Sequence, residues 1–299
     1  MKPAAFDYLA PTSVEEALAL LADLGDGAKP LAGGQSLVPL MNFRLVRPQH
    51  LVDLNGLGEL AGIRQDDGHL VIGAMTRQRA VETSALVSRR CPLLAEAMPQ
   101  IGHAQIRNRG TVGGSLAHAD PAAELPAVVA ALDGELVVRS ARGRRTMKSE
   151  QFFVGYLTTA AQPGELLVEV RLPAMPPRTG TAFMEISRRH GDFALVGVAT
   201  TLTVDEAGVC IGSAIALTGV GPTPVVAREA ARALVGVRPS PEALEDAGRR
   251  VSASVHPDSD LHASSEYRKH VAGVLTRRAL ARAAERARGT GRPGDGGPR

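Results

Sequence analysis

Cysteine is nearly absent from this chain. The two cysteines, Cys91 and Cys210, are too few for a four-thiolate iron–sulfur cluster or a Cys-rich zinc site. They are expected to pack as small apolar residues in a reducing compartment. Any iron–sulfur or metal chemistry in which the chain takes part must therefore use ligands from another polypeptide.

Aromatic residues and long apolar runs are scarce as well. Three Tyr, six Phe and no Trp in 299 residues argue against a surface that stacks nucleic-acid bases. No apolar run approaches the roughly 20 residues that a membrane span requires. The N-terminus begins Met-Lys-Pro and has no apolar signal core. We expect a cytoplasmic protein without a membrane span.

Positive charge is concentrated near the C-terminus. From Arg268 to Arg299, nine Lys or Arg residues stand against Glu285 and Asp295, although the whole chain has a formal net charge of only +3. Such a segment can bind nucleic acid or an acidic partner, but it more often forms a solvated helix face. We therefore expect no nucleic-acid partner.

Hydrophobic periodicity predicts a small α/β unit first. Ser13-Val-Glu-Glu16 is a capping box before an amphipathic helix that stops at Gly25. A buried strand at 30–32, a short helix at 37–43 and a second strand at 49–54 follow.

The middle of the chain predicts a second unit of strands and helices. Strands are expected at 60–64, 69–73, 135–140 and 166–172, and helices at 77–87, 92–101 and 125–132. The stretch 105–119 is rich in Gly, Ser and polar residues, so we expect a long loop there.

A linker at 173–180 precedes a third unit. Its expected strands are 182–187, 194–204 and 210–218, and its expected helices are 228–234, 241–253 and 266–288. Strands followed by helices, without alternation, indicate a separate α+β unit.

Two glycine-containing segments have the composition of a phosphate site. The first glycine segment, Ala32-Gly-Gly-Gln-Ser36, follows a predicted strand, so its N–H groups can converge on a pyrophosphate that lies against the main chain. Ser36 adds a hydroxyl. The alternative is a simple tight turn.

The second glycine segment is Gly110-Thr-Val-Gly-Gly-Ser-Leu-Ala117, and it could clamp the other side of the same anion. Arg107, Asn108 and Arg109 precede it and offer positive charge and amide donors. The alternative is a flexible surface loop. Neither segment matches GxGxxG or GxxxxGK[ST], so a phosphate site here requires another fold.

Histidines flank the second segment. His103 and His118, with Asp120, could be imagined as metal ligands, but no i, i+4 pair on a helix supports this. Loop histidines that hydrogen-bond the backbone or a ligand phosphate are the favoured interpretation, and we expect no metal site.

Both segments, with their flanks, resemble a known family. The first continues as Leu37-Val-Pro-Leu-Met-Asn-Phe-Arg44, and the second as Ser115-Leu-Ala-His-Ala-Asp-Pro-Ala-Ala-Glu124. Together they resemble the FAD-binding medium subunit of molybdenum hydroxylases, as in aerobic carbon monoxide dehydrogenase and, more distantly, xanthine dehydrogenase. Residues 72–76, 191–196 and 266–275 fit as well, and the resemblance extends to about residue 285.

The resemblance implies an α+β fold. A two-lobed FAD-binding domain of the vanillyl-alcohol-oxidase type would occupy residues 1–175, with lobes of about 1–57 and 58–175. A C-terminal α+β domain, a short antiparallel sheet with helices, would occupy 176–288. The remaining residues, 289–299, are rich in Gly, Pro and Arg and are expected to form a disordered tail.

The resemblance also implies the cofactor site. Both glycine segments would wrap the FAD pyrophosphate, Glu124 would lie near the ribityl or ribose hydroxyls, and Asp192 with Phe193 near the isoalloxazine ring. No catalytic residue is implied. The implied FAD-binding residues are Ala32, Gly33, Gly34, Gln35, Ser36, Leu37, Thr111, Val112, Gly113, Gly114, Ser115, Glu124, Asp192 and Phe193.

Two positions depart from the family pattern. Gln35 stands where the family often has His, so this side chain cannot titrate. Phe193 stands where Tyr is frequent, and it lacks the hydroxyl. Arg188, Arg189 and His190, just before Asp192, could contact the flavin edge or another subunit, or form a solvated turn.

The function implied by the resemblance is an electron relay. Electrons would leave a molybdenum-cofactor large subunit, pass through an iron–sulfur small subunit, reduce this FAD and go to an external acceptor, in a dimer of heterotrimers. One alternative is a self-contained FAD-dependent oxidoreductase acting on a small substrate. Another is an interaction protein that has lost FAD, which the intact glycines argue against.

Overall fold

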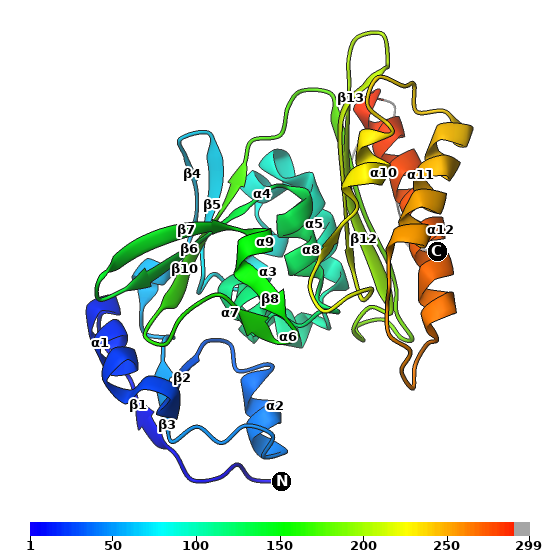
Figure 1. The fold of residues 1–299 in the computed structure, drawn as a ribbon. Helices are drawn as coiled ribbons and strands as arrows, with labels where there is room; N and C mark the ends of the chain where they lie inside the picture. Colours follow the sequence, from blue (N-terminus) through cyan, green and yellow to red (C-terminus); the bar gives the residue numbers. More distant parts are fainter. Residues whose placement is uncertain (290–299) are drawn as a thin grey trace.

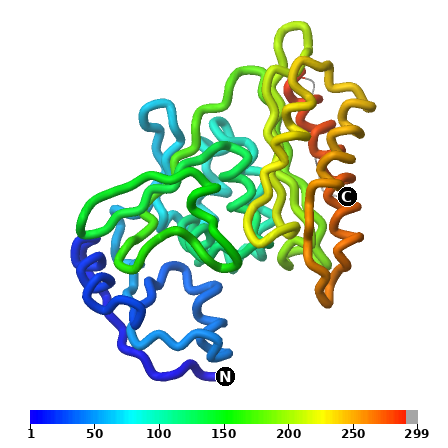
Figure 2. Tube along the Cα trace, viewed as in Figure 1, coloured from blue at the N-terminus to red at the C-terminus, as the bar shows by residue number. Residues whose placement is uncertain are grey.

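Three β-sheets, each packed against helices, organise the protein. The computed structural model describes residues 1–289, so the expectation of a disordered tail lies almost wholly outside the described residues. Figure 1 shows the N-terminal sheet, the central sheet and the C-terminal sheet following one another across the molecule. The tube of Figure 2 follows the chain through the same three parts, from blue at the N-terminus through green to red at the C-terminal helix.

The N-terminal lobe is a small parallel sheet with two helices. Its strands β1 (Asp7–Leu9), β2 (Ala28–Leu31) and β3 (His50–Asp53) have the order β1-β3-β2. Helix α1 (Val14–Leu24) connects β1 to β2, and helix α2 (Leu37–Asn42) lies between β2 and β3.

Helix α1 shows how the sequence sets its boundaries. Ser13 accepts a hydrogen bond from the N–H of Glu16, as a capping box requires. The Glu16 carboxylate, however, accepts from the N–H of Thr12 at 2.7 Å instead of from Ser13. Gly25, with φ of +53°, then ends the helix.

The central part is a five-stranded antiparallel sheet with helices on it. The strand order is β4-β5-β10-β6-β7, and fully buried side chains such as Leu93, Leu116 and Leu136 join this sheet to the helices. A two-stranded ribbon follows the sheet. The elements are β4 (Ile63–Asp66), β5 (His69–Gly73), α3 (Gln78–Glu82), α4 (Ala85–Arg90), α5 (Pro92–Ala97), α6 (Ala104–Arg109), α7 (Val112–His118), α8 (Glu124–Ala131), β6 (Glu135–Ser140), β7 (Gly143–Lys148), α9 (Ser149–Phe152), β8 (Phe153–Gly155), β9 (Thr158–Thr159) and β10 (Leu166–Pro173).

The C-terminal part is an antiparallel sheet of four strands between two helical layers. Helices α11 and α12 pack against one another and α12 also packs on β11 and β12, while α5 and α8 of the central part also contact this sheet (Figure 1). The elements are β11 (Thr179–Ile186), β12 (Val196–Val204), β13 (Cys210–Thr218), β14 (Val225–Val226), α10 (Arg228–Arg232), α11 (Pro241–Ser254) and α12 (Ser265–Ala287). The expected α+β class is confirmed.

The basic helix α12 uses some of its cations inside the protein. Arg268 is 7% exposed and donates to the carbonyl oxygen of Gly219 and to the carboxylate of Asp260. Arg286 forms an ion pair with Glu96 of helix α5. These contacts fasten α12 to the sheet and to the central helices. No helix within residues 1–289 is long and apolar enough to cross a membrane.

The expected loop at 105–119 was wrong. These residues form most of α6 and all of α7. Thr111 caps α7 by accepting a hydrogen bond from the N–H of Gly114 at 3.0 Å. The glycines that suggested a loop are there for packing, because a Cβ on Gly113 would lie 2.7 Å from Cα of Ala74.

Gly180 provides a test of the packing of α12 on the C-terminal sheet. A Cβ at this position of β11 would lie 2.6 Å from the backbone N of Ala287, so Gly180→Ala must push the helix away. We expect a loss of about 2 kcal/mol in the free energy of unfolding, measured by urea denaturation. Gly212→Ala in β13 is the control, since its nearest neighbour, Thr203, lies at 3.9 Å. Equal losses in the two variants would contradict this account.

Candidate functional site

The first glycine segment presents backbone donors at the end of a parallel strand. It follows β2 directly, and Gly34 has φ of +74°, a conformation that favours glycine. Within residues 1–289, no acceptor pairs with the N–H groups of Gly34, Gln35 or Ser36. The Ser36 hydroxyl, at the start of α2, also makes no capping bond. This is the donor set that a phosphate group requires.

The Gln35 side chain forms a hydrogen bond within the first glycine segment. Its Nε2 donates to the carbonyl oxygen of Gly33 at 3.1 Å. The amide therefore folds back on its own main chain and braces the turn that contains Gly34. Leu37, the first residue of α2, is half-buried beside it.

The second glycine segment differs chemically from the first, although both have the composition of a phosphate site. Its N–H groups already have protein acceptors: Val112 donates to Thr76, Gly113 to Ala74 and Ser115 to Thr111. Thr111 is also buried and engaged in capping. This segment therefore supplies a close-packed backbone surface and the half-buried Ser115, and not a second set of free amides.

The charge expected beside this segment is also partly committed elsewhere. Arg107 is 7% exposed and forms an ion pair with Glu82 at 2.9 Å, which lowers the pKa of Glu82. It further donates to the carbonyl oxygen of Ile101. Arg107 thus fixes α6 to its surroundings and is not available to a ligand.

The two glycine segments meet in space. A Cβ on Gly33 would lie 2.9 Å from Cα of Gly110, so only glycine permits this approach. A Cβ on Gly114 would lie 3.3 Å from Cβ of Ala32. The fold therefore brings together residues 32–36 and 110–115, which the sequence analysis assigned to one anion.

The buried carboxyl of Glu124 and the half-buried carboxyl of Glu185 interact electrostatically across the junction of the central part and the C-terminal sheet. Glu124, at the start of α8, is 3% exposed, and burial raises its pKa to about 7, with a smaller contribution from Asp120. Burial raises the pKa of Glu185 on β11 to about 8, and the charge of Glu124 adds to this effect. Oε2 of Glu185 is buried without a hydrogen-bond partner in residues 1–289.

Sequence reasoning missed Glu185. Register explains its position: Glu185 pairs with Gly197 on β12, and Gly197 pairs with Thr218 on β13. The side chains of Thr218 and Glu185 close over Gly197, since a Cβ there would lie 2.7 Å from Cγ2 of Thr218 and 3.5 Å from Cβ of Glu185. An unpaired buried carboxyl oxygen is costly unless another group completes it, so the site fits a ligand that carries hydroxyl or amide groups.

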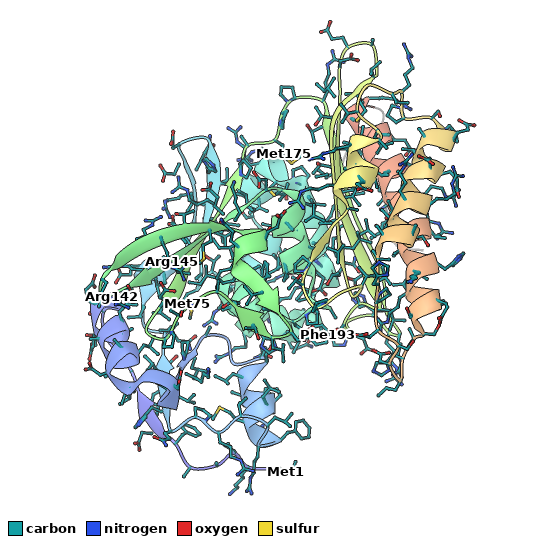
Figure 3. The ribbon with its side chains drawn as sticks, viewed as in Figure 1. Met1, Met75, Arg142, Arg145, Met175 and Phe193 are labelled. Carbon is teal, nitrogen blue, oxygen red and sulfur yellow. The ribbon has the colours of Figure 1, made fainter. Side chains whose placement is uncertain are left out.

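The turn that contains Asp192 and Phe193 lies at one end of the C-terminal sheet. Both residues are exposed, Phe193 by 57%, and Figure 3 shows Phe193 at the end of the sheet that lies toward the N-terminal lobe. The turn rests on the central helices, because a Cβ on Gly191 would lie 2.7 Å from Nδ1 of His103. His103 and His190 also contact through their rings, with centroids 5.9 Å apart.

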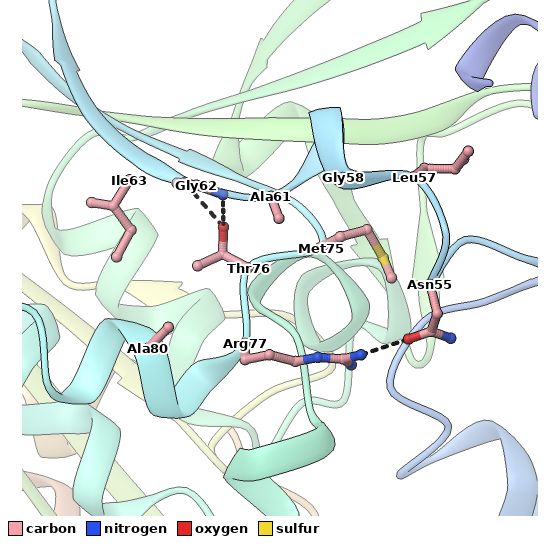
Figure 4. A pocket seen from close by; sticks show the side chains of 10 residues that line it. All are labelled: Asn55, Leu57, Gly58, Ala61, Gly62, Ile63, Met75, Thr76, Arg77 and Ala80. Carbon is pink, nitrogen blue, oxygen red and sulfur yellow. Dashed lines mark hydrogen bonds between the residues drawn. The ribbon is translucent and has the colours of Figure 1, made fainter. Parts of the chain in front are cut away.

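A polar link that the sequence analysis also missed runs along the junction of the lobes. Arg77 donates to Oδ1 of Asn55, and Asn55 donates to the carbonyl oxygen of Ala32. Figure 4 shows both side chains at a cavity of about 370 Å³, which Met75 and Thr76 also line. No sequence motif signals this link, since it depends on contacts between lobes.

Neither cysteine is available for metal or redox chemistry. Cys91 and Cys210 are 2% and 0% exposed, and both are free thiols. Burial raises the pKa of Cys91 to about 12, and it raises the pKa of Cys210 as well. In the described residues, no group of three or more His, Cys, Asp or Glu could hold a metal ion.

Comparison with known proteins identifies the class. Residues 4–175 match the family described as the FAD binding domain in molybdopterin dehydrogenase, and residues 181–283 match the CO dehydrogenase flavoprotein C-terminal domain. These are the parts that hold the two glycine segments and the turn with Phe193, respectively. The class is therefore a flavoprotein of the molybdenum-containing dehydrogenases.

Individual relatives agree over nearly the whole chain. Subunit alpha of the 6-hydroxypseudooxynicotine dehydrogenase complex of Paenarthrobacter nicotinovorans is 46% identical, over 97% of this chain and 98% of its own. The carbon monoxide dehydrogenase medium chain of Afipia carboxidovorans is 41% identical, over 96% and 100%. A solved structure of the Cu,Mo-CO dehydrogenase has a chain with a TM-score of 0.93 at 40% identity, over 96% and 100%.

This chain belongs to the family of FAD-binding medium subunits of molybdenum hydroxylases. Its cofactor is FAD, and it is an oxidoreductase flavoprotein. Both expectations of the sequence analysis are confirmed.

The carboxyl pair predicts a pH dependence of stability. Since the pKa of Glu185 is raised to about 8, the folded protein retains a proton that the unfolded chain loses at lower pH. Stability is therefore fully present below the ordinary carboxyl pKa and falls as the pH rises toward about 8. In Glu185→Gln, we expect the fall between about pH 5 and 8 to shrink by on the order of 1 kcal/mol or more.

The measurement is urea denaturation of flavin-free protein over this pH range. Glu206→Gln, at a carboxylate that is 93% exposed, is the matched control and should retain the wild-type slope. A wild-type slope in Glu185→Gln would show that this carboxyl does not retain a proton in the folded state.

Proposed function

We propose that this chain is the electron-transfer subunit of a carbon monoxide dehydrogenase-like molybdenum hydroxylase. It accepts electrons from an iron–sulfur subunit and passes them to an external acceptor. The observation that supports this most directly is the meeting of the two glycine segments in a chain whose only cysteines are buried thiols. A flavin site is present, whereas the ligands for an iron–sulfur donor are not.

The pyrophosphate of FAD is placed, in this proposal, at the first glycine segment. The N–H groups of Gly34, Gln35 and Ser36 would donate to its oxygens, and the Ser36 hydroxyl would add a further bond. Ala32, Gly33 and Leu37 would form the floor. From the second segment, Thr111, Val112, Gly113 and Gly114 would close the other side as packed backbone, and Ser115 would offer its hydroxyl.

The rest of the cofactor would extend toward the C-terminal sheet. Glu124 is proposed as the partner of the ribityl or ribose hydroxyls, because it is buried at the start of α8. Asp192 and Phe193 are proposed to border the isoalloxazine ring. Phe193 contributes ring packing but no hydrogen bond, and Gln35 cannot exchange a proton with the cofactor. The redox chemistry is that of the bound flavin, while this chain supplies placement and electrostatics.

The boundaries proposed for this arrangement follow the sheets. An FAD-binding domain of residues 1–175, with lobes of about 1–57 and 58–175, would hold the cofactor, and a domain of residues 176–288 would cover its ring. The contacts of α5 and α8 with β11, β12 and β13 support a close junction between the two.

The partners proposed are an iron–sulfur small subunit and a molybdenum-cofactor large subunit, in a cytoplasmic dimer of heterotrimers. The name of one relative supports this, since it is a subunit of a dehydrogenase complex. The alternative, a self-contained FAD-dependent oxidoreductase, would need a substrate domain. The 41% identical carbon monoxide dehydrogenase medium chain matches 96% of this chain, which supports the relay instead.

Flavin release tests the mode of binding. We expect one FAD per chain, held without a covalent bond, because neither glycine segment contains His or Cys. Acid precipitation should leave the yellow colour in the supernatant, measured by absorbance. Colour that stays with the precipitated wild-type chain, and leaves it in His103→Ala, would reveal a histidyl link instead.

Reconstitution tests the relay. The native protein should copurify with a cysteine-rich chain that contains iron and with a large chain that contains molybdenum. The isolated FAD-loaded chain should not oxidise the substrate of the complex, and addition of both partners should restore turnover, measured as acceptor reduction. Robust oxidation by the isolated chain, free of iron and molybdenum, would favour the self-contained enzyme.

A further inference from the structure

A chain of three hydrogen bonds connects the backbones of the two glycine regions. Arg77, just before α3, donates through one guanidinium nitrogen to the carbonyl oxygen of Arg109 at 2.5 Å. Through the other nitrogen it donates to Oδ1 of Asn55 at 2.6 Å. Asn55 Nδ2 then donates to the carbonyl oxygen of Ala32 at 3.0 Å. The link thus begins beside Gly110 and ends beside Gly33.

The link lies at the place where the two segments touch. Ala32 and Arg109 are the neighbours in sequence of Gly33 and Gly110, and a Cβ on Gly33 would lie 2.9 Å from Cα of Gly110. Glycine contacts of this kind permit an approach but do not hold it, because they supply little buried apolar area. Directional hydrogen bonds from a planar guanidinium can hold it.

Arg77 is restrained from both sides for this task. Its backbone forms a β-bridge with Thr111, the cap of α7. Asn55 is restrained in turn, because Oδ1 of Asp53 accepts both its N–H, at 3.0 Å, and its side-chain amide. Among the described residues, no carboxylate forms an ion pair with Arg77. Its guanidinium group therefore donates both hydrogen bonds to neutral acceptors, the carbonyl oxygen of Arg109 and Oδ1 of Asn55.

We propose that Arg77 and Asn55 are positioning residues of the FAD site. Their link sets the separation of the two glycine segments, and this separation determines how well the pyrophosphate fits between them. Neither residue belongs to the fourteen positions implied by the family motifs. The inference rests on the proposed function, in that both segments must contact FAD.

The test compares FAD affinity with stability in full-length, flavin-stripped protein. The variants are Arg77→Gln, Asn55→Ala and the double variant. Arg79→Gln is the matched control, because it removes the same charge two residues further on, from a side chain that within residues 1–289 forms an ion pair with Glu82 alone. The FAD dissociation constant is measured by flavin fluorescence at low and high salt, and the free energy of unfolding by urea without FAD.

Positioning predicts a specific pattern. Each single variant should weaken FAD binding about tenfold, which is about 1.4 kcal/mol, and the double variant should bind no more weakly than the weaker single, since both substitutions break one link. Arg79→Gln should bind within about twofold of wild type, because the Arg79 side chain is 50% exposed and pairs with Glu82 instead of with either glycine segment. Flavin-free stability should change far less than affinity.

Other patterns overturn the proposal. If Asn55→Ala binds like wild type while Arg77→Gln is weakened in a salt-dependent way, Arg77 acts through its charge alone. If affinity falls only in proportion to flavin-free stability, the link is merely structural. Arg77→Lys provides a second probe, since it keeps the charge but cannot fork to both acceptors: wild-type affinity in this variant would refute positioning.

The two levels of inference fail differently. Wild-type protein that binds no FAD would refute the proposed function, and with it the positioning role of Arg77 and Asn55. Wild-type protein that binds FAD, with all variants equal to it, would refute only the role of Arg77 and Asn55.

Discussion

The close approach of Gly33 to the backbone of Arg109 and Gly110 is the constraint on which the site depends. It joins the end of a parallel strand in the N-terminal lobe to the turn between two helices of the central part. A Cβ at Gly33 would separate the lobes, and the free amides of the first segment would then face solvent. The parallel sheet and α7 thus both place glycine backbone, without side chains, at the junction of the two lobes.

The two sides of this junction perform different physical tasks. The first segment leaves its amides unpaired, which costs energy in the absence of a ligand and suits an anion. The second satisfies its amides internally, through Ala74, Thr76 and Thr111, and is therefore rigid. The first segment therefore supplies the free donors, and the second supplies a packed surface beside them.

Much of the fold could be predicted from the sequence, because its elements are periodic and well capped. The strands 135–140 and 210–218 and the three C-terminal helices lie where the pattern placed them. Strand β7 was not foreseen, since Gly143–Lys148 is polar and forms an exposed edge. Helix α6 was not foreseen because the stretch 105–109 is mostly polar. Helix α7 was not foreseen because glycine has low helix propensity, and only the contact of Gly113 with Ala74 explains its presence.

The sequence motifs of the candidate site could be predicted, but the residues that hold these motifs in place could not. The glycine segments are local in sequence, and so is Glu124 within the family pattern. Glu185 is different, because its position depends on the register of β11, where it pairs with Gly197 of β12. The sequence of β11 predicts a strand but does not indicate that one of its carboxyl groups belongs to a site. Asn55 and Arg77 acquire a role only when two lobes dock, which no local pattern encodes.

The carboxyl groups of Glu124 and Glu185 connect the central part to the C-terminal sheet. Glu124 belongs to α8 of the central part and Glu185 to β11, so the energy of their interaction depends on how these parts are docked. The same docking holds the turn at Phe193 against His103. A ligand group that satisfied the unpaired oxygen of Glu185 would thereby stabilise the docked arrangement and the placement of Phe193 together.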